Sequence, residues 1–351
     1  MSVEKGIRIF QVVFSLALFY SSNVMSWGER GHDIVARLAA RHLIEQGEKE
    51  LYIPFQQREF MLGHLANVPD IVWKSDAMDE AARKNNSPTH YINLDIVNKN
   101  PTSIEEIPRA FNAYVRAANV SSAASVEQLG SAPWRIQQLH RLMKQAFERA
   151  GNAKHQVGLV KHVNSALLYG GLMAHFVGDL GNPHHTTSDF DGQASGNGGL
   201  HAYFESHVVN EIGLHLADSV FTSMQEADLI EESLMKWTSD LSLSELKSDP
   251  LSLSLALSID SYQNLPSLIS LDNRHSLIER STGANNMAKR KHPWKVKQYY
   301  EPLIVERLAL ASTVLAQLWQ SAWEQAGSPD LSRFFSFYYP TAPEYIYPDY
   351  Q

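Results

Sequence analysis

VGLVKHVNSALLYGGLMAHFVGDLGNPHH, residues 157–185, carries the strongest structural signal in the chain. Its apolar residues recur every three or four positions as far as Asp179, which predicts a long helix over residues 157–179. Pro183 ends this helix, because proline lacks an amide hydrogen and clashes with the preceding turn. The helix therefore places His175 and Asp179 in its last turns and is followed at once by His185.

The same apolar spacing recurs elsewhere and predicts an all-α fold. It is clear over residues 131–150 and 301–326, it is approximate over residues 34–44, and it begins again near His201. Residues 241–268, rich in serine and leucine, are expected to form one or two buried helices. No convincing alternation of polar and apolar residues is present, so strand-rich fold classes are not expected.

Composition and charge exclude several classes of protein. The chain has 351 residues, of which 44% are hydrophobic and 19% are charged, and this length can bury a core without disulfides. Its 38 acidic residues exceed its 30 Lys and Arg, so a broad basic surface for nucleic acid is excluded. Because it has 15 histidines and no cysteine, thiolate catalysis and Cys-type zinc sites are excluded as well.

The first 26 residues are typical of a secretory signal peptide. Lys5 and Arg8 precede an apolar stretch over residues 9–20, and small residues lead to a cleavage position after Ser26. The alternative is a membrane anchor, for which twelve apolar residues are too few. We therefore expect a protein that is secreted or periplasmic, and the lack of cysteine favours a bacterial origin.

Two pairs of residues four positions apart point to metal binding. His175 and Asp179 form one pair and His201 and Glu205 form the other, and residues i and i+4 of a helix face the same way. An isolated helical histidine is usually structural, but two pairs with His185 between them favour a metal site built across a helical bundle. Imidazole nitrogens and carboxylate oxygens are ligands that suit zinc.

The predicted cleavage site adds a second source of ligands. Cleavage after Ser26 would give Trp27 a free amine, a nitrogen donor whose own carbonyl oxygen is close enough to chelate the same ion. His32 follows five positions later in the motif Trp-Gly-Glu-Arg-Gly-His and could join them.

These motifs together resemble the S1/P1 nuclease and zinc-dependent phospholipase C superfamily. The resemblance runs from Trp27 to about Ala326 and also includes His90-Tyr-Ile-Asn93 and the string from His175 to His185. It implies one mainly α-helical domain, which we place at residues 27–330, around three clustered zinc ions. Residues 331–351, rich in aromatic residues, are expected to pack back on that domain as an extended tail.

The resemblance also implies a ligand set. The implied ligands are Asp70, His90, His175 and Asp179 for the first zinc; His185, His201 and Glu205 for the second; and Trp27, His32 and Asp179 for the third. An alternative for Asp70 is that it caps a helix after Pro69. His184, although adjacent to a ligand, is left out of the set.

The implied reaction is hydrolysis of a phosphate ester by zinc-activated water, with Asp179 as bridging ligand and as the group that orients the nucleophile. The first hypothesis is a single-strand-preferring endonuclease and 3′-nucleotidase that gives 5′-phosphates. The glycine-rich approach to His201 resembles the nuclease branch, and Tyr91 stands where nucleases place an aromatic side chain that stacks on a base. Ordinary packing is the alternative for Tyr91.

The second hypothesis is a phospholipase C that cleaves phosphatidylcholine-type lipids. Glu205 replaces the aspartate usual in nucleases, Asn93 replaces another aspartate, and Trp73 stands where many nucleases have an arginine, with Lys74 next to it. A zinc scavenger without activity is a third hypothesis. The basic run in the loop over residues 281–297, which contains Trp294, could bind phosphate or a lipid headgroup, although such runs are usually solvated loops.

Overall fold

The described part of the chain is almost entirely helical. The computed structural model describes residues 27–46, 49–118, 125–226, 228–282, 286–336 and 343–351. Its long helices are α1 (Gly28–Gln46), α3 (Glu59–Ile71), α8 (Ala132–Gly151), α9 (Gln156–Gly181), α12 (Leu216–Glu226), α15 (Pro250–Leu271) and α16 (Lys297–Gln325). The prediction of an all-α fold is thereby confirmed.

Shorter elements connect the long helices. The short α-helices are α2 (Lys49–Tyr52), α4 (Glu80–Asn86), α5 (Leu94–Val97), α6 (Phe111–Ala117), α7 (Ser125–Leu129), α10 (Leu200–Ala202), α11 (Val209–Ile212), α13 (Leu229–Leu234) and α14 (Leu243–Ser248). The 3-10 and π turns are η1 (Ser87–His90), η2 (Ile104–Glu106), η3 (Pro183–Thr186), η4 (Tyr203–Val208), η5 (Met235–Trp237), η6 (Asp272–Ser276) and η7 (Pro293–Lys295). Two short strands, β1 (Leu277–Glu279) and β2 (Lys289–Arg290), pair antiparallel.

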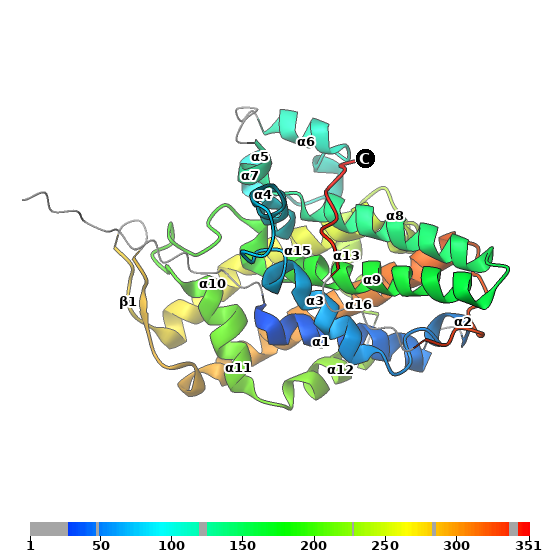
Figure 1. The fold of residues 1–351 in the computed structure, drawn as a ribbon. Helices are drawn as coiled ribbons and strands as arrows, with labels where there is room; N and C mark the ends of the chain where they lie inside the picture. The colour runs from blue at the N-terminus through cyan, green and yellow to red at the C-terminus, as the bar shows by residue number, and fades with distance from the viewer. Residues whose placement is uncertain (1–26, 47–48, 119–124, 227, 283–285, 337–342) are drawn as a thin grey trace, which may run out of the picture.

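Helix α9 is the central element of the fold. It packs against α8 and α3, and it also contacts α1, α15 and α16 (Figure 1). Every residue from Gly170 to Gly181 is buried, so this end of the helix has no solvent-facing side. A helix that is apolar all round belongs in a core, and here it carries its last polar residues into the centre of the domain.

Helix α16 is a core helix by the same criterion. By length and composition it is apolar enough to cross a bilayer, but 72% of its most apolar window is buried inside the domain. It contacts α1, α8, α9 and α12, and these contacts account for its composition.

Two regions differ from the sequence expectation. The helix predicted to begin near His201 is broken into α10, a π-helical turn over Tyr203–Val208, and α11. The loop expected over residues 281–297 contains β2 and a 3-10 turn in its described part, and β1 lies just before it. The apolar spacing used to predict helices could not reveal the π turn, because such a turn shifts the helical register. It could not reveal the two strands either, because they are only two and three residues long.

The C-terminal segment, residues 343–351, lies along α8 (Figure 1). Trp73 donates its indole hydrogen to the Pro343 carbonyl at 3.1 Å, and Tyr350 stacks on Phe111 with ring centroids 4.2 Å apart. Gln138 of α8 donates to the Tyr347 carbonyl at 2.7 Å. Residues 1–26, the predicted signal peptide, lie outside the described residues.

A buried histidine in this core makes stability depend on pH. His140 of α8 lies 2.8 Å from the Ser321 hydroxyl of α16, and burial lowers its pKa to about 4. Since the unfolded chain binds a proton near pH 6.5 and the folded protein does not, its contribution is present above pH 6.5 and is lost as pH falls toward 4. The loss is about 3 kcal/mol of unfolding free energy at most.

Urea unfolding of the wild type and a His140→Leu variant at several pH values, both with chelator present, measures this contribution. The advantage of the neutral histidine over leucine should shrink as pH falls through this window. A difference in unfolding free energy that stays constant from pH 7 to pH 4 would show that His140 is protonated in the folded state.

Candidate metal centre

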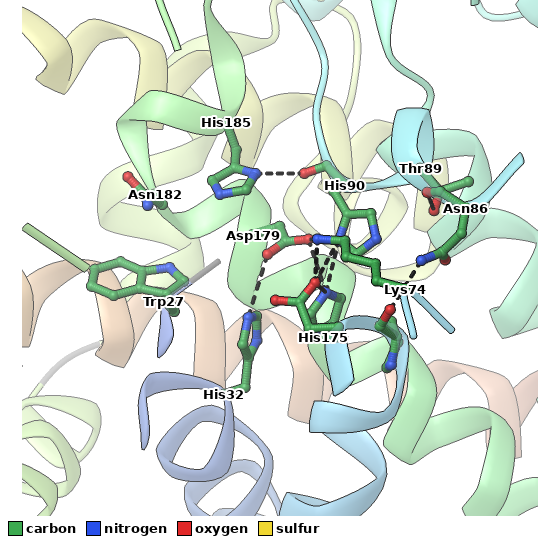
Figure 2. A network of polar contacts seen from close by, with 12 residues as sticks. Trp27, His32, Lys74, Asn86, Thr89, His90, His175, Asp179, Asn182 and His185 are labelled. Carbon is green, nitrogen blue, oxygen red and sulfur yellow. Dashed lines mark hydrogen bonds and ion pairs between the residues drawn. The ribbon is translucent and has the colours of Figure 1, made fainter. Parts of the chain in front are cut away.

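The predicted ligands come together from separate elements at the C-terminal end of α9. This helix supplies His175 and Asp179, both fully buried, while α1 supplies His32 (Figure 2). The remaining side chains converge on the same point: Asp70 from the last turn of α3, His90 from η1, His185 from η3, His201 from α10 and Glu205 from the π turn. Asp70 lies near the end of a helix rather than at its start, so it does not act as an N-terminal cap.

The first group has the dimensions of a zinc site. The Nδ1 atom of His90 lies 3.1 Å from the nearer Asp179 oxygen, and the Nε2 atom of His175 lies 3.4 Å from the same oxygen. Asp70 Oδ1 is 3.7 Å from the His90 nitrogen and 3.6 Å from the His175 nitrogen. Ligands bound to one zinc at tetrahedral angles lie about 3.3–3.4 Å apart, so these four residues fit around one ion.

The second group is equally compact. His201 Nε2 lies 2.8 Å from Glu205 Oε2 and 2.9 Å from His185 Nε2, and His185 Nε2 lies 3.7 Å from the same Glu205 oxygen. All three side chains are buried. This arrangement offers two imidazole nitrogens and one carboxylate oxygen to a single ion, which leaves room for solvent or substrate.

Two histidines are oriented by backbone carbonyls. Nδ1 of His175 lies 2.7 Å from the Ala66 carbonyl oxygen, and Nδ1 of His185 lies 2.7 Å from the His90 carbonyl oxygen. Each Nδ1 therefore carries the hydrogen, and each Nε2 keeps a lone pair that points into the centre. A second hydrogen bond of this kind is typical of metal-binding histidines.

Trp27 and His32 approach the centre from a different side. His32 Nε2 lies 3.5 Å from the second Asp179 oxygen, and its ring stacks on His175 at 4.1 Å. The backbone nitrogen of Trp27 donates to Glu205 Oε2 at 2.9 Å, and the Trp27 carbonyl accepts from Gly31 at 3.1 Å. Asp179 thus has one oxygen toward His32 and the other toward His90 and His175.

Within the described part of the chain, several buried polar atoms of the centre have no hydrogen-bond partner. Among the described residues, both ring nitrogens of His32, Nε2 of His90, Asp179 Oδ1 and Glu205 Oε1 form no hydrogen bond. Buried polar groups are nearly always satisfied, so a cluster of unsatisfied atoms is evidence for a missing ligand. The donor set, which contains imidazole and carboxylate only, fits zinc.

Burial sets the protonation of these groups in the absence of metal. It lowers the pKa of His32, His90 and His175 well below the usual value, so the imidazoles are neutral and their lone pairs are available. It raises the pKa of Asp179 well above its usual value and that of Glu205 to about 7. Positive charge from bound metal would stabilise both carboxylates in the ionised form.

Three residues of the centre were missed or left out by sequence reasoning. The ammonium of Lys74 contacts Asp70 at the mouth of the centre, while Trp73 is fully buried and points away toward Pro343. Asn182 donates from its amide nitrogen to Glu205 Oε2 at 2.9 Å and holds that carboxylate. His184 is buried and stacks on His201 with ring centroids 5.4 Å apart.

A pocket of about 610 Å³ opens beside the two histidine groups. Its lining consists of Lys74, Ser87, His90, Tyr91, Asn93, Ile96, Glu127, Gln128, His184, His185, Ser188, Phe190 and His201. Tyr91 donates its phenolic hydrogen to the Glu127 carbonyl, and burial raises its pKa to about 12, so its ring is held and uncharged. Phe190 remains 53% exposed. The volume is within the usual range for small-molecule sites.

Comparison with protein families identifies a relationship for most of the chain. A sequence model of the S1/P1 nuclease family matches residues 27–318. No curated protein matches the chain significantly. The matched region begins at Trp27 and includes every predicted ligand.

A single glycine controls how closely His32 approaches Asp179. A Cβ atom at Gly178 would lie 2.8 Å from His32 Nδ1, a distance that forces the imidazole to move. We expect Gly178→Ala to lower the metal content of the purified protein and to destabilise it by about 1–3 kcal/mol, the usual cost of overpacking.

Elemental analysis of the purified variant and its thermal unfolding measure both effects. The matched control is Gly158→Ala in the same helix, where a Cβ would meet only Ala153 at 3.4 Å. The control should keep wild-type metal content. Equal metal content in the two variants would contradict the placement of His32 at the centre.

Proposed function

The chain belongs to the S1/P1 nuclease family, and from this premise we propose that it is a zinc-dependent endonuclease and 3′-nucleotidase that prefers single strands and leaves 5′-phosphates. The family match supports a hydrolase that acts on phosphate esters. Single-strand preference, the type of product and the number of three zinc ions are parts of the proposal.

The lining of the pocket beside the metal ligands is the observation that carries the proposal. Of the residues that line it, only Ile96 and Phe190 have purely hydrocarbon side chains. Polar side chains such as Asn93, Gln128 and Ser188 offer hydrogen-bond partners for the edges of a nucleobase and for a sugar. Tyr91 and Phe190 supply aromatic faces on which a base could stack, an interaction that tolerates any base.

Bound zinc, Asp179 and Lys74 would each have a distinct role in hydrolysis. Bound zinc would supply an activated water and would stabilise negative charge on the phosphate. Asp179, whose two oxygens face different histidines, would orient the attacking water. Lys74 lines the pocket and contacts Asp70, so its ammonium would bind a phosphate oxygen of the substrate.

A phospholipase C remains the second candidate because of Glu205. The longer carboxylate is the phospholipase choice by resemblance, and here it belongs to a π turn that places it 2.8 Å from His201. This hypothesis requires that a lipid headgroup enter the pocket and that its phosphate reach the metal ligands His90, His185 and His201 that line it.

We further propose that the protein is exported and cleaved after Ser26. The start of the family match at Trp27 supports this boundary. A free Trp27 amine has a lone pair available for a metal ion, whereas the lone pair of an amide nitrogen is delocalised into the adjacent carbonyl.

The proposed cleavage predicts a difference in metal content. The protein that begins at Trp27 should hold one more zinc per chain than the same protein with a single alanine before Trp27. Elemental analysis after dialysis measures the ratio, and native mass spectrometry identifies the N-terminus. Identical zinc content in the two forms would refute the N-terminal ligand.

A paired assay tests the activity itself. Release of acid-soluble nucleotide from single-stranded DNA and RNA is compared with release of phosphocholine from phosphatidylcholine, each with and without chelator. We expect chelator-sensitive turnover of nucleic acid, and Asp179→Asn should reduce it at least a thousandfold, roughly the effect of losing a metal-bridging carboxylate.

The control for this variant is Asp33→Asn, which removes a partly exposed partner of Arg37 and touches no ligand. It should keep wild-type turnover. Turnover of lipid alone would establish the phospholipase hypothesis, and zinc binding without turnover of either substrate would establish the scavenger hypothesis.

A further inference from the structure

A basic hairpin, which we define as the described residues 274–282 and 286–297, lies at the edge of the domain next to α10 (Figure 1). It contains β1, β2 and η7. In this stretch seven Lys and Arg accompany one Glu, although the whole chain has a net charge of −8. Such a concentration of positive charge in an acidic protein is a local feature of the kind that binds a polyanion.

Several cations of the basic hairpin are available to a ligand. Lys289, Lys291 and Lys295 are exposed, and no carboxylate of the described residues forms an ion pair with them. The exposed Trp294, at 57%, lies beneath the Lys295 ammonium, which is 5.7 Å from the ring centroid. Tyr299, 44% exposed, lies immediately beyond the hairpin. Cations interleaved with exposed aromatic rings are typical of surfaces that bind single-stranded nucleic acid.

The basic hairpin is fixed to the loop that forms one wall of the pocket. Backbone nitrogens of Ser281 and Ala288 donate to the carbonyls of Gly196 and Gly198 at 3.0 and 2.8 Å. Arg290 donates to the Gly198 carbonyl at 2.9 Å and pairs with the buried carboxylate of Asp272.

The same loop, residues 186–199, supplies Ser188 and Phe190 to the pocket and leads directly to His201. Arg290 is therefore a structural cation, and Lys291 also donates from its ammonium to the His275 carbonyl at 2.7 Å. Within the described residues, Lys289 and Lys295 form no hydrogen bond or ion pair with another side chain, and Lys295 lies over the Trp294 ring. The hairpin is therefore anchored to the same loop that supplies part of the pocket lining.

We propose that the basic hairpin binds the phosphate backbone of a single-stranded nucleic acid whose reacting nucleotide occupies the pocket. The inference rests on the proposed nuclease function and deepens it, because it gives the enzyme a reason to prefer polymers over mononucleotides. The exposed lysines neutralise phosphates, and Trp294 stacks on a base. Ile278 and Met287 are also exposed here, but the exposed Trp294 beneath the Lys295 ammonium pairs an aromatic face for a base with a cation for a phosphate, which favours a strand over an anionic membrane.

The test uses a triple variant with alanine in place of Lys289, Lys291 and Lys295. The matched control replaces Lys144, Lys154 and Lys161, which lie on α8, on α9 or between them, at the opposite end of the molecule (Figure 1). Both variants lose the same charge, and neither touches a predicted ligand or pocket residue. Binding of fluorescent oligothymidylate is measured by anisotropy with chelator present, so that it does not depend on turnover, and over a range of salt concentrations.

We expect the hairpin variant to bind the oligonucleotide about tenfold more weakly at low salt, and the slope of log K against log salt to fall by about two. With zinc present, KM for long strands should rise with little change in kcat, while cleavage of a dinucleotide stays within twofold of wild type. Trp294→Ala should weaken binding further. The control variant should bind and cleave like the wild type.

Three results would overturn the proposal. The first is equal affinity and equal salt slope in the hairpin and control variants. The second is a loss of dinucleotide cleavage as large as the loss on long strands, which would mean that the lysines only support the pocket wall. The third is hairpin-dependent binding to vesicles of anionic phospholipid without any effect on strand binding. If the wild type cleaves no nucleic acid, the proposed function has failed, and the anisotropy measurement still decides whether the hairpin binds a strand.

Discussion

The buried carboxylate of Asp179 is the constraint around which the molecule is organised. An ionised carboxylate with no exposed surface is unstable unless positive charge or hydrogen bonds surround it. Here its two oxygens face three histidines that come from α1, η1 and α9 itself. The close approach of α1 requires a glycine at position 178, and the all-apolar surface of α9 removes water from the site. The ionised Asp179 carboxylate thus leaves negative charge without sufficient compensation in the interior, and the positive charge of bound metal ions would balance it.

Much of this arrangement could be predicted from the sequence. The helices α8, α9 and α16 follow from a sustained apolar period, and the spacing of His175 and Asp179 already places both on one helix face. The proximity of Asp70, His90 and His32 does not follow from any local pattern. It depends on how distant helices pack, and only the resemblance to a known family suggested it before the geometry was described.

The features that sequence reasoning missed have physical causes in common. Lys74 and Asn182 act through tertiary contacts, one with Asp70 and the other with Glu205, and neither belongs to a recognisable spacing. The π turn at Tyr203–Val208 is invisible to a search for a 3.6-residue period. It also places Glu205 within reach of Asn182 and the Trp27 backbone nitrogen, so this carboxylate, a predicted metal ligand, also anchors the beginning of the described chain.

Residues near both ends of the described chain form hydrogen bonds with residues in or beside the candidate metal centre. Trp27 reaches Glu205 across 178 residues, and Pro343 accepts the indole hydrogen of Trp73, the neighbour of Lys74, across 270 residues. Contacts of such long sequence separation form late, because their loop-closure entropy is paid before they contribute stability. A chain still emerging from the ribosome therefore cannot form the contact between Trp73 and Pro343 until that part of the sequence has been synthesised. The buried Trp73, next to Lys74, thus gains its indole hydrogen bond only when residues near position 343 have folded back onto the domain.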